Sequence, residues 1–562
     1  MKTRRLLAAA ASLLALSTTP LASASEAGFR WFRYEGSDPV DAVAKPAPGE
    51  FRNPILAGFY PDPSIVRVGP DYYLVNSSFS WFPGIPVWHS RDLVNWRQIG
   101  NAIDRAGMVD FNGKELSQGL FAPTISWHEG TFYIANTCFA CGGNFILTAK
   151  DPAGPWSQPH WFRDLGWGID PSLFFDEDGS AWLLNNDVPV GGESWSGHRA
   201  VFLQRLDLAT MTLMGERHMI LSGGVRPEEK PEYAEGPHIF RKGGYYYLTV
   251  AEGGTGTRHA QTVLRSKSVT GPYEAFAGNP ILTQRDLDPK RPFPITSAGH
   301  ADLVDTVDGD WWAVFLATRP YAEDFYNTGR ETFLLPVNWT EDGWPTILPH
   351  GKPIPDVAKR PRLPRDTKPP MPTSGPFSVQ EEFNGAALGP HWMTMRGPSD
   401  GWLKLDNGML KLVPRREGLG DLASPSFVAR RQQQMNMEAS TQLSFQPGPG
   451  EAAGLAILQR DEYWYALLLA DRGGGQRELR LLVRSGAETP KAGKLLASAP
   501  VPDGDIRLRI VGEGGRFRFD WAAPGGDWQT LLADADGRLL STGVARGFVG
   551  AMVGPYAVKI QP

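Results

Sequence analysis

The chain has little cysteine: its 562 residues contain only Cys138 and Cys141, which share one Cys-x-x-Cys motif. Two thiolates cannot close a tetrahedral zinc site. A redox Cys-x-x-Cys motif is expected beside a βαβ unit, whereas this pair lies in a strand-rich stretch. The sequence therefore predicts a structural pair, either bridged or free, rather than a redox centre.

A large excess of charge of either sign is also missing. The formal net charge is −5 at pH 7, and charged residues make up 21% of the chain. Proteins that bind nucleic acids or anionic membrane surfaces need a basic surface, so neither partner is expected. The apolar run at residues 6–16 is too short to span a bilayer, and we expect no membrane insertion.

Residues 1–24 have the pattern of a secretory signal peptide. Lys2, Arg4 and Arg5 form a basic start, the short apolar run follows, and Ala22-Ser23-Ala24 fits the small-residue cleavage pattern. We expect the mature chain to begin near Ser25 and the protein to be secreted or periplasmic.

Convincing amphipathic helices are absent, whereas turn formers and aromatic residues are plentiful. The chain has 63 glycines, 48 prolines and 19 tryptophans. This composition favours an all-β protein with a surface on which sugars can stack, although aromatic side chains also fill cores. The length allows two or three domains.

One short phrase recurs five times: an acidic or small residue, usually followed by proline, precedes a β-branched or aromatic run. Repeats separated by roughly fifty to sixty-five residues predict five blades of a β-propeller. The five phrases are Asp62-Pro63-Ser64, Ala122-Pro123-Thr124, Asp170-Pro171-Ser172, Glu235-Gly236-Pro237 and Gly299-His300-Ala301.

The remaining chain divides by composition. We assign residues 51–348 to the five-bladed propeller, which is the candidate catalytic domain, and residues 349–376, rich in proline, to a semi-rigid linker or surface strap. Residues 377–562 have short alternating strands with glycine turns, including a hairpin at Asn407-Gly408, and predict a concanavalin-like β-sandwich. This second domain contains no catalytic constellation. Residues 25–50 form an N-terminal segment without a more specific assignment.

Three of the five phrases carry a carboxylate. The first strand of each propeller blade lies nearest the axis, so Asp62, Asp170 and Glu235 are expected to meet at one end of the central channel. Two carboxyl groups that face a glycosidic bond can hydrolyse it, one as acid and one as base. Glu235, with its longer side chain before a stiff Gly-Pro pair, is the candidate general acid. Asp62 is the candidate base, and Asp170 the group that raises the pKa of the acid.

Other interpretations compete with these assignments. An aspartate before proline is often only a turn residue or a cap. Glu232 is the main competitor for the role of acid, although Pro231 in front of it favours a solvated loop. Three carboxylates at matching positions of three repeats favour the catalytic interpretation.

Together these motifs resemble glycoside hydrolase family 43, close to the β-xylosidase members that carry a C-terminal sandwich. The likeness is strong over residues 53–347 and looser in the second domain. The motifs that carry it are Asn53-Pro54-Ile55 through Asp62-Pro63-Ser64, Ser77-Ser78-Phe79-Ser80-Trp81-Phe82-Pro83-Gly84, Ile169-Asp170-Pro171-Ser172, Ala234-Glu235-Gly236-Pro237-His238, Gly299-His300-Ala301-Asp302 and Gly329-Arg330-Glu331-Thr332-Phe333.

The resemblance implies a five-bladed propeller and hydrolysis with inversion. By position, Asp62 matches the general base, Asp170 the pKa modulator and Glu235 the general acid. Inversion leaves room for a water molecule, so the carboxyl groups of Asp62 and Glu235 are expected roughly 6.5–9.5 Å apart.

The resemblance also implies substrate-binding residues. Phe79 matches an aromatic wall of the sugar pocket, with Trp81 in the same motif, and Arg319 matches an arginine that binds sugar hydroxyls, although it can equally bridge two blades. His300 matches an axial histidine beneath the sugar. In some members this position neighbours a bound calcium or water, so calcium near His300 is one interpretation and a hydrogen-bonding core histidine is the other. No cofactor is required.

One position departs from the family. Its β-xylosidases usually have tryptophan before Ala-Pro in the second unit, where this chain has Phe121. Phenylalanine stacks with less area and lacks the indole N–H, which leaves the preference for the leaving group open.

Three hypotheses follow. The first is an exo-acting, inverting β-xylosidase that acts on xylo-oligosaccharides or arabinoxylan fragments, with α-L-arabinofuranosidase as a second or even the main activity. The second is a non-catalytic, sugar-binding propeller. The third is a retaining glycosidase or transferase, whose two carboxyl groups would lie only about 5–5.5 Å apart.

Overall fold

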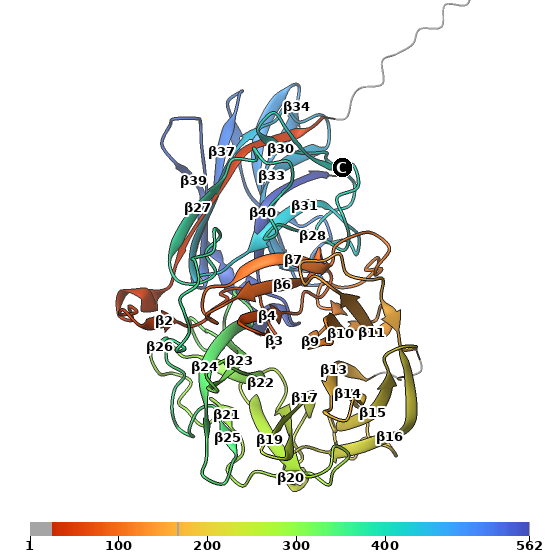
Figure 1. The fold of residues 1–562 in the computed structure, drawn as a ribbon. Coiled ribbons are helices and arrows are strands. Elements are labelled where there is room, and N and C mark those ends of the chain that lie inside the picture. The colour runs from red at the N-terminus through yellow and green to blue at the C-terminus, as the bar shows by residue number, and fades with distance from the viewer. Residues whose placement is uncertain (1–24, 164, 166–167, 561–562) are drawn as a thin grey trace, which may run out of the picture.

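Five antiparallel sheets surround one axis in the first part of the chain and form a five-bladed β-propeller (Figure 1). The computed structural model describes residues 25–163, 165 and 168–560, so the expected signal peptide at residues 1–24 lies outside the described residues. Among the described residues, no helix is long and apolar enough to cross a bilayer.

Each of the five predicted repeats forms one blade. Blade 1 contains β3 (Ser64–Val68), β4 (Asp71–Val75), β6 (Gly84–Ser90) and β7 (Arg97–Ile103). Blade 2 contains β8 (Gly119–Leu120), β9 (Thr124–His128), β10 (Thr131–Phe139), β11 (Gly143–Ala149) and β12 (His160–Trp161). Blade 3 contains β13 (Ile169–Phe175), β14 (Ala181–Asp187), β15 (Ala200–Asp207) and β16 (Thr212–Ser222).

Blades 4 and 5 complete the ring. Blade 4 contains β17 (Glu235–Lys242), β18 (Tyr245–Glu252), β19 (Ala260–Ser266), β20 (Glu274–Ala275) and β21 (Leu282–Thr283). Blade 5 contains β22 (Thr296–Asp305), β23 (Trp311–Thr318), β24 (Glu331–Trp339) and β25 (Pro345–Thr346). The inner strands β3, β9, β13, β17 and β22 contact one another around the axis, as their places in Figure 1 show.

A belt of polar groups joins the inner strands beneath their first residues. Four of its links are side-chain hydrogen bonds: Ser64 Oγ to Asp302 Oδ2 (2.8 Å), Ile125 N to Ser64 Oγ (3.1 Å), Thr124 Oγ1 to Pro171 O (2.9 Å) and Ser172 Oγ to Pro237 O (2.5 Å). His238 Nδ1, 3.6 Å from Asp302 Oδ1, completes the ring between blades 4 and 5. The belt fixes the relative height of all five blades, which sets the positions of the residues above it.

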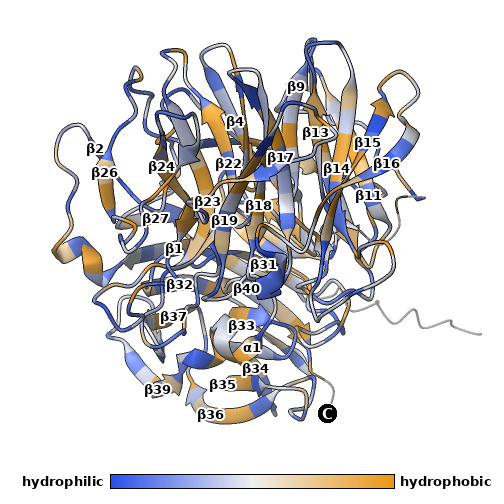
Figure 2. Ribbon diagram, turned by 90° about the horizontal axis from the view of Figure 1, so that it is seen from below, coloured by the Kyte–Doolittle hydropathy of each residue, from blue (hydrophilic) through white to orange (hydrophobic). Residues whose placement is uncertain are grey.

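Separate hydrophobic clusters fill the spaces between neighbouring blades. Val87 of blade 1 and Ile134 of blade 2 belong to one cluster, and Leu184 of blade 3 and Leu248 of blade 4 belong to another. Figure 2 shows hydrophobic segments along the strands of both domains and hydrophilic segments in many of the loops. Burying these side chains stabilises the blade contacts by about 25 cal/mol per Å² of apolar surface.

The proline-rich stretch is a strap on the surface of the propeller. Its strand β26 (Val357–Lys359) pairs with β2 (Glu50–Arg52), which precedes blade 1. Arg360 binds the buried carboxylate of Asp92 in blade 1, and Arg362 binds Asp310 in blade 5. The strap therefore ties the first and last blades together.

The second domain is a sandwich of two sheets. One sheet has the order β29 (Leu403–Asp406), β30 (Met409–Leu412), β1 (Ala27–Ser37), β32 (Asn436–Ser444), β37 (Ile506–Glu513), β38 (Arg516–Ala522) and β39 (Gln529–Asp536), with β27 (Phe377–Glu381) also pairing with β1. The other has the order β36 (Lys494–Val501), β35 (Gln476–Ser485), β34 (Tyr463–Gly473), β33 (Glu451–Arg460), β40 (Met552–Lys559), β31 (Ser426–Arg431), β28 (Met393–Met395) and β5 (Trp81–Phe82).

Helical turns are short in the described residues: η1 (Pro39–Ala42), η2 (Pro227–Glu229), η3 (Gly537–Leu540) and α1 (Thr542–Ala545).

Two segments cross between the domains. The N-terminal strand β1, red in Figure 1, lies inside a sandwich sheet, with Tyr34 opposite Ala439. In the other direction, β5 of the propeller extends the second sandwich sheet, because Phe82 pairs with Thr394 of β28. The two domains therefore share strands as well as a hydrophobic cluster that includes Phe79 and Phe427.

Candidate active site

Four residues of the inner strands, or of the turns just before them, have an unusual backbone conformation. Asp62, Asp170 and His300 have φ of 52°, 54° and 50°, and Gly236 has 58°. Residues other than glycine rarely adopt this left-handed region, and its use at functional sites is common. At Asp62 and Asp170 the following residue is a proline, whose ring fixes its own φ and stiffens the backbone that carries the carboxylate at the start of the strand.

All five blades contribute to one pocket at this end of the axis. Each blade supplies one residue from its repeated phrase: Asp62, Ala122, Asp170 and Glu235 lie at or just before the start of their inner strands, and His300 lies within β22. The remaining lining residues are Phe79, Phe121, Ile169, Thr255, Arg330 and Phe548. The three carboxylates that the repeats pointed to therefore lie in the same pocket.

Asp62 is buried and held by two donors from different blades. Arg330 Nη1 donates to its Oδ1 at 2.8 Å, and Ser77 Oγ donates to its Oδ2 at 2.6 Å. An ionised carboxylate accepts bonds of this kind, and both orient it. In this arrangement Asp62 can accept a proton from a water molecule in the pocket.

Asp170 lies between two hydrogen-bond donors on the floor of the pocket. Its Oδ2 accepts from Asn186 Nδ2 and from the backbone N–H of Gly236, both at 3.1 Å. Burial, with the negative charge of Asp62, raises the pKa of Asp170 to about 7.

Glu235 shares the pocket with both aspartates. Burial, together with the negative charges of Asp170 and Asp62, raises the pKa of the Glu235 carboxyl well above its usual range. A carboxyl group with such a pKa keeps its proton near neutral pH, which is the condition for a general acid. The positive charge of Arg330 acts in the opposite direction on this pKa and is the smaller influence.

His300 occupies the corresponding position in blade 5. Burial lowers the pKa of His300 to about 4, so its ring is neutral at neutral pH. Gly236 lies against this ring: a Cβ added to the glycine would sit 2.7 Å from Cε1 of His300. The histidine and the loop that carries Glu235 are therefore in direct contact, and a side chain at position 236 would displace one of them.

Four phenylalanines form an aromatic wall on one side of the pocket. Phe79 stacks on Phe548 with ring centroids 5.9 Å apart, and Phe121 meets Phe79 edge to face at 5.4 Å. Phe139 stacks on Phe121 at 4.7 Å. Because Phe548 follows α1 in the sandwich domain, the second domain helps to form the pocket, a contribution that the sequence analysis did not predict.

The expected sugar-binding role of Arg319 does not fit its position. Its side chain is 4% exposed, and its Nε and Nη2 donate to both carboxylate oxygens of Glu331 at 2.6 and 2.8 Å. Its Nη1 binds Asp38. The guanidinium is therefore committed to two buried carboxylates, one in its own blade 5 and one directly after β1, so it does not bridge two blades either. The arginine that lines the pocket is Arg330.

Trp81 is likewise outside the pocket. It is fully buried, lies in β5 and pairs with Met395 of the sandwich. Its ring contributes to the interface between the domains, so the expectation that Trp81 contacts the substrate is wrong. Phe79, two residues earlier in the same motif, does line the pocket, and its φ is 51°.

Two further residues are clarified by the structure. Glu232, the competitor for the role of acid, does not line the pocket. Arg330 does, and sequence analysis missed it even though the Gly329-Arg330-Glu331 motif marked the stretch. Phe548 had no comparable signal, since only the docking of the sandwich brings it to the propeller.

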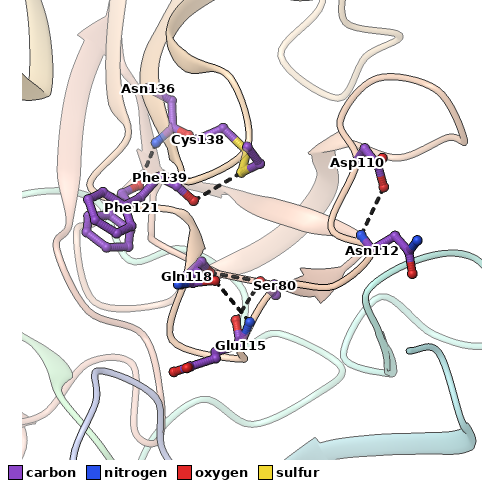
Figure 3. Close-up of a disulfide and its surroundings, with 10 residues drawn as sticks. Ser80, Asp110, Asn112, Glu115, Gln118, Phe121, Asn136, Cys138 and Phe139 are labelled. Carbon is purple, nitrogen blue, oxygen red and sulfur yellow. Dashed lines mark hydrogen bonds between the residues drawn. A yellow bond between two sulfur atoms is a disulfide. The ribbon is translucent and has the colours of Figure 1, made fainter. Parts of the chain in front are cut away.

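The predicted cysteine pair is bridged. Cys138, in β10, and Cys141 form a disulfide next to Phe139 (Figure 3). The bridge supports the structural interpretation of the motif.

A propeller that gathers three carboxylates, an arginine and an aromatic wall in one axial pocket has the architecture of a glycoside hydrolase. Residues 51–345 match glycosyl hydrolases family 43, and residues 380–562 match the β-xylosidase C-terminal concanavalin A-like domain. The chain belongs to glycoside hydrolase family 43.

Similar proteins span nearly the whole chain. A xylosidase/arabinosidase of Butyrivibrio fibrisolvens is 38% identical over 512 residues, which cover 90% of this chain and 95% of the relative. A non-reducing end α-L-arabinofuranosidase of Bacteroides ovatus is 37% identical over 516 residues, covering 90% and 91%. The crystal structure of a family-43 protein retrieved from a capybara gut metagenome superposes with a TM-score of 0.88 at 36% identity, covering 96% and 100%.

Proposed function

We propose that this glycoside hydrolase releases single xylose or α-L-arabinofuranose units from the non-reducing ends of xylo-oligosaccharides or arabinoxylan fragments, with inversion. The observation that carries the proposal is the placement of Asp62, Asp170 and Glu235 in one axial pocket, with the pKa of Glu235 raised. The relatives named xylosidase/arabinosidase and α-L-arabinofuranosidase support the two sugars.

The residues divide the reaction as follows. Glu235 donates its proton to the departing glycosidic oxygen, and Asp62 removes a proton from the water that attacks the anomeric carbon from the opposite side. Asp170 acts through its charge on Glu235 and through its hydrogen bond to Gly236. Arg330 and Ser77 orient Asp62.

An exo mode of action is supported by the shape of the site. The pocket lies at one end of the propeller axis and is lined by residues of all five blades, and the polar belt joins the inner strands beneath it. Phe79 and Phe548 close one side. A site of this form accepts a chain end rather than the middle of a polymer.

Hydrolysis of phenyl β-D-xyloside and phenyl α-L-arabinofuranoside, whose poor leaving group needs a proton, by the wild type and by Glu235→Ala tests the proposal. We expect release from at least one of the two substrates and a large loss in the variant. Absence of release from both, or a fully active variant, would contradict it. Xylo-oligosaccharide binding without any new reducing ends would instead support a sugar-binding protein.

The side chains around His300 do not make a good calcium site. Calcium prefers six to eight oxygen ligands. In the described part of the chain, no three His, Cys, Asp or Glu side chains gather as a metal site. The carboxylate whose charge acts on His300 is that of Asp62, and it is already paired with Arg330. We propose that hydrolysis needs no metal, and we expect activity to survive extensive dialysis against a chelator.

We also propose that the protein is exported. The signal-like pattern of residues 1–24 and the disulfide between Cys138 and Cys141 both support an oxidising compartment. Amino-terminal sequencing of the mature protein tests this, with a start near Ser25 expected.

A further inference from the structure

The aromatic wall of the pocket continues outward beyond the residues that line it. Phe79, deep in the pocket, is 1% exposed. Phe121 lines the pocket and stacks face to face on Phe139, at 4.7 Å and an interplanar angle of 12°. Phe139 does not line the pocket and is 42% exposed. The wall therefore ends in a phenyl ring that is supported by Phe121 and open to solvent.

The chain positions Phe139 on the pocket side of blade 2. Strand β9 begins at Thr124, two residues after the pocket residue Ala122, and β10 runs back antiparallel to it, ending at Phe139. Phe139 pairs there with Gly119 of β8. The backbone of Phe121 is bonded to the same strand, since its N–H donates to Thr137 O at 3.0 Å.

The disulfide lies at this point of the hairpin. Cys138 precedes Phe139, and the Sγ of Cys141 lies 3.3 Å from the carbonyl oxygen of Phe139 (Figure 3). Between them, Ala140 has φ of 61°, a conformation that a residue with a side chain rarely adopts. A bridge between residues three apart closes a very short loop, and short loops constrain the unfolded chain least. Its main effect is therefore local: it fixes the hairpin tip that carries Phe139.

We propose that Phe139 forms a sugar-stacking platform for the leaving-group side of an oligosaccharide, and that the Cys138–Cys141 bridge holds this platform in place. This inference rests on the proposed function. The terminal sugar occupies the axial pocket, and the sugar ring that is to be released with the leaving group stacks on the open side of Phe139. Phe121 supports the ring of Phe139 from behind, which leaves the outer face of Phe139 for a sugar.

The first test compares a disaccharide with the methyl glycoside of the same terminal sugar, which has no second ring. In Phe139→Ala we expect the KM for the disaccharide to rise about three- to tenfold, the range of one aromatic contact, and the KM for the methyl glycoside to rise less. Phe139→Trp, which keeps an aromatic ring at this position, should have the KM of the wild type for the disaccharide. Trp127→Ala is the matched control, because Trp127 is a 40% exposed aromatic residue at the opposite end of the same blade.

The second test addresses the bridge. The double variant Cys138→Ala, Cys141→Ala should show the same rise in the KM for the disaccharide, with little change in Tm. Combined with Phe139→Ala, it should add little further, because both changes act on the same contact. Full additivity of the two effects would contradict a role of the bridge in placing Phe139.

Binding measurements separate this inference from the proposed reaction. In the Glu235→Gln background, calorimetry compares disaccharide with monosaccharide, with and without Phe139→Ala. A loss of affinity confined to the disaccharide supports the platform. Equal affinities with and without the phenyl ring overturn it, and a wild-type protein that binds the disaccharide but never cleaves it overturns only the proposed reaction.

Discussion

The backbone N–H of Gly236 donates a hydrogen bond to Oδ2 of Asp170, with the two atoms 3.1 Å apart. The carboxylate of blade 3 is thereby fixed beside the residue that follows Glu235 in blade 4. This link explains how a carboxylate that need not touch the substrate can govern the acid: it sets the position of the Glu235 loop and places a negative charge near its carboxyl group.

The first prediction concerns that charge. In Asp170→Asn the side chain keeps its size, but the negative charge that raises the pKa of Glu235 is gone. The pKa of Glu235 then falls, so the acid loses its proton at lower pH. We expect the alkaline limb of the pH profile of kcat/KM to move down by about one unit.

The control for this profile is Asp178→Asn, which removes a carboxylate that caps an exposed turn at Ser180. Its profile should match the wild type. An alkaline limb that stays in place in Asp170→Asn would show that Asp170 does not set the pKa of the acid.

The second prediction separates the acid from its sequence neighbour. Glu235→Gln should lower kcat/KM on a disaccharide by about 10²–10⁴-fold, the usual contribution of a general acid. A dinitrophenyl glycoside should lose far less, because its leaving group departs without a proton. Glu232→Gln, outside the pocket, should remain close to the wild type on both substrates. An equal loss on both substrates in Glu235→Gln would argue against proton donation.

The third prediction concerns Arg319. Removing its charge in Arg319→Met leaves Asp38 and Glu331 buried without their partner. Breaking a buried pair in this way costs about 3–5 kcal/mol, so Tm should fall clearly. Arg362→Met, which breaks an exposed pair with Asp310, should cost no more than about 1 kcal/mol. An unchanged Tm together with a raised KM in Arg319→Met would contradict this account and would indicate that Arg319 binds the sugar.

The fourth prediction concerns the contribution of the sandwich. Phe548→Ala removes the ring that stacks on Phe79 and lies 5.5 Å from the guanidinium of Arg330. We expect kcat/KM to fall by about tenfold, from the loss of one aromatic contact. Leu496→Ala, an exposed apolar residue of the same domain, serves as the control. Unchanged kinetics would mean that the sandwich only supports the propeller.

Much of this arrangement follows from local sequence. The repeated phrase predicted five blades because each inner strand carries it, and it placed Asp62, Asp170 and Glu235 at equivalent points of three blades. The axis then brings them together whatever their separation in the chain. The alternation of buried and half-buried residues in β37 likewise predicted a sandwich strand.

The remainder depends on contacts between distant segments. Residues 27–37 have no local feature that selects β32 and β30 as partners, and that pairing appears only when the sandwich is assembled. The positions of Phe548 and Trp81 also depend on the docking of the two domains, which places Phe548 at the pocket and Trp81 in the interface. Arg319 and Arg330 are both arginines of blade 5, and only the buried carboxylates around Arg319 distinguish them.

The most direct test of the account is the anomer of the sugar that is released first, followed by ¹H NMR during hydrolysis of an aryl β-D-xyloside or aryl α-L-arabinofuranoside. A water activated by Asp62 and a proton from Glu235 act on opposite faces of the sugar, so the xyloside should yield α-xylose first and the arabinofuranoside β-arabinose first. Initial release of the anomer with the configuration of the substrate would contradict this account, because it would make Asp62 a nucleophile.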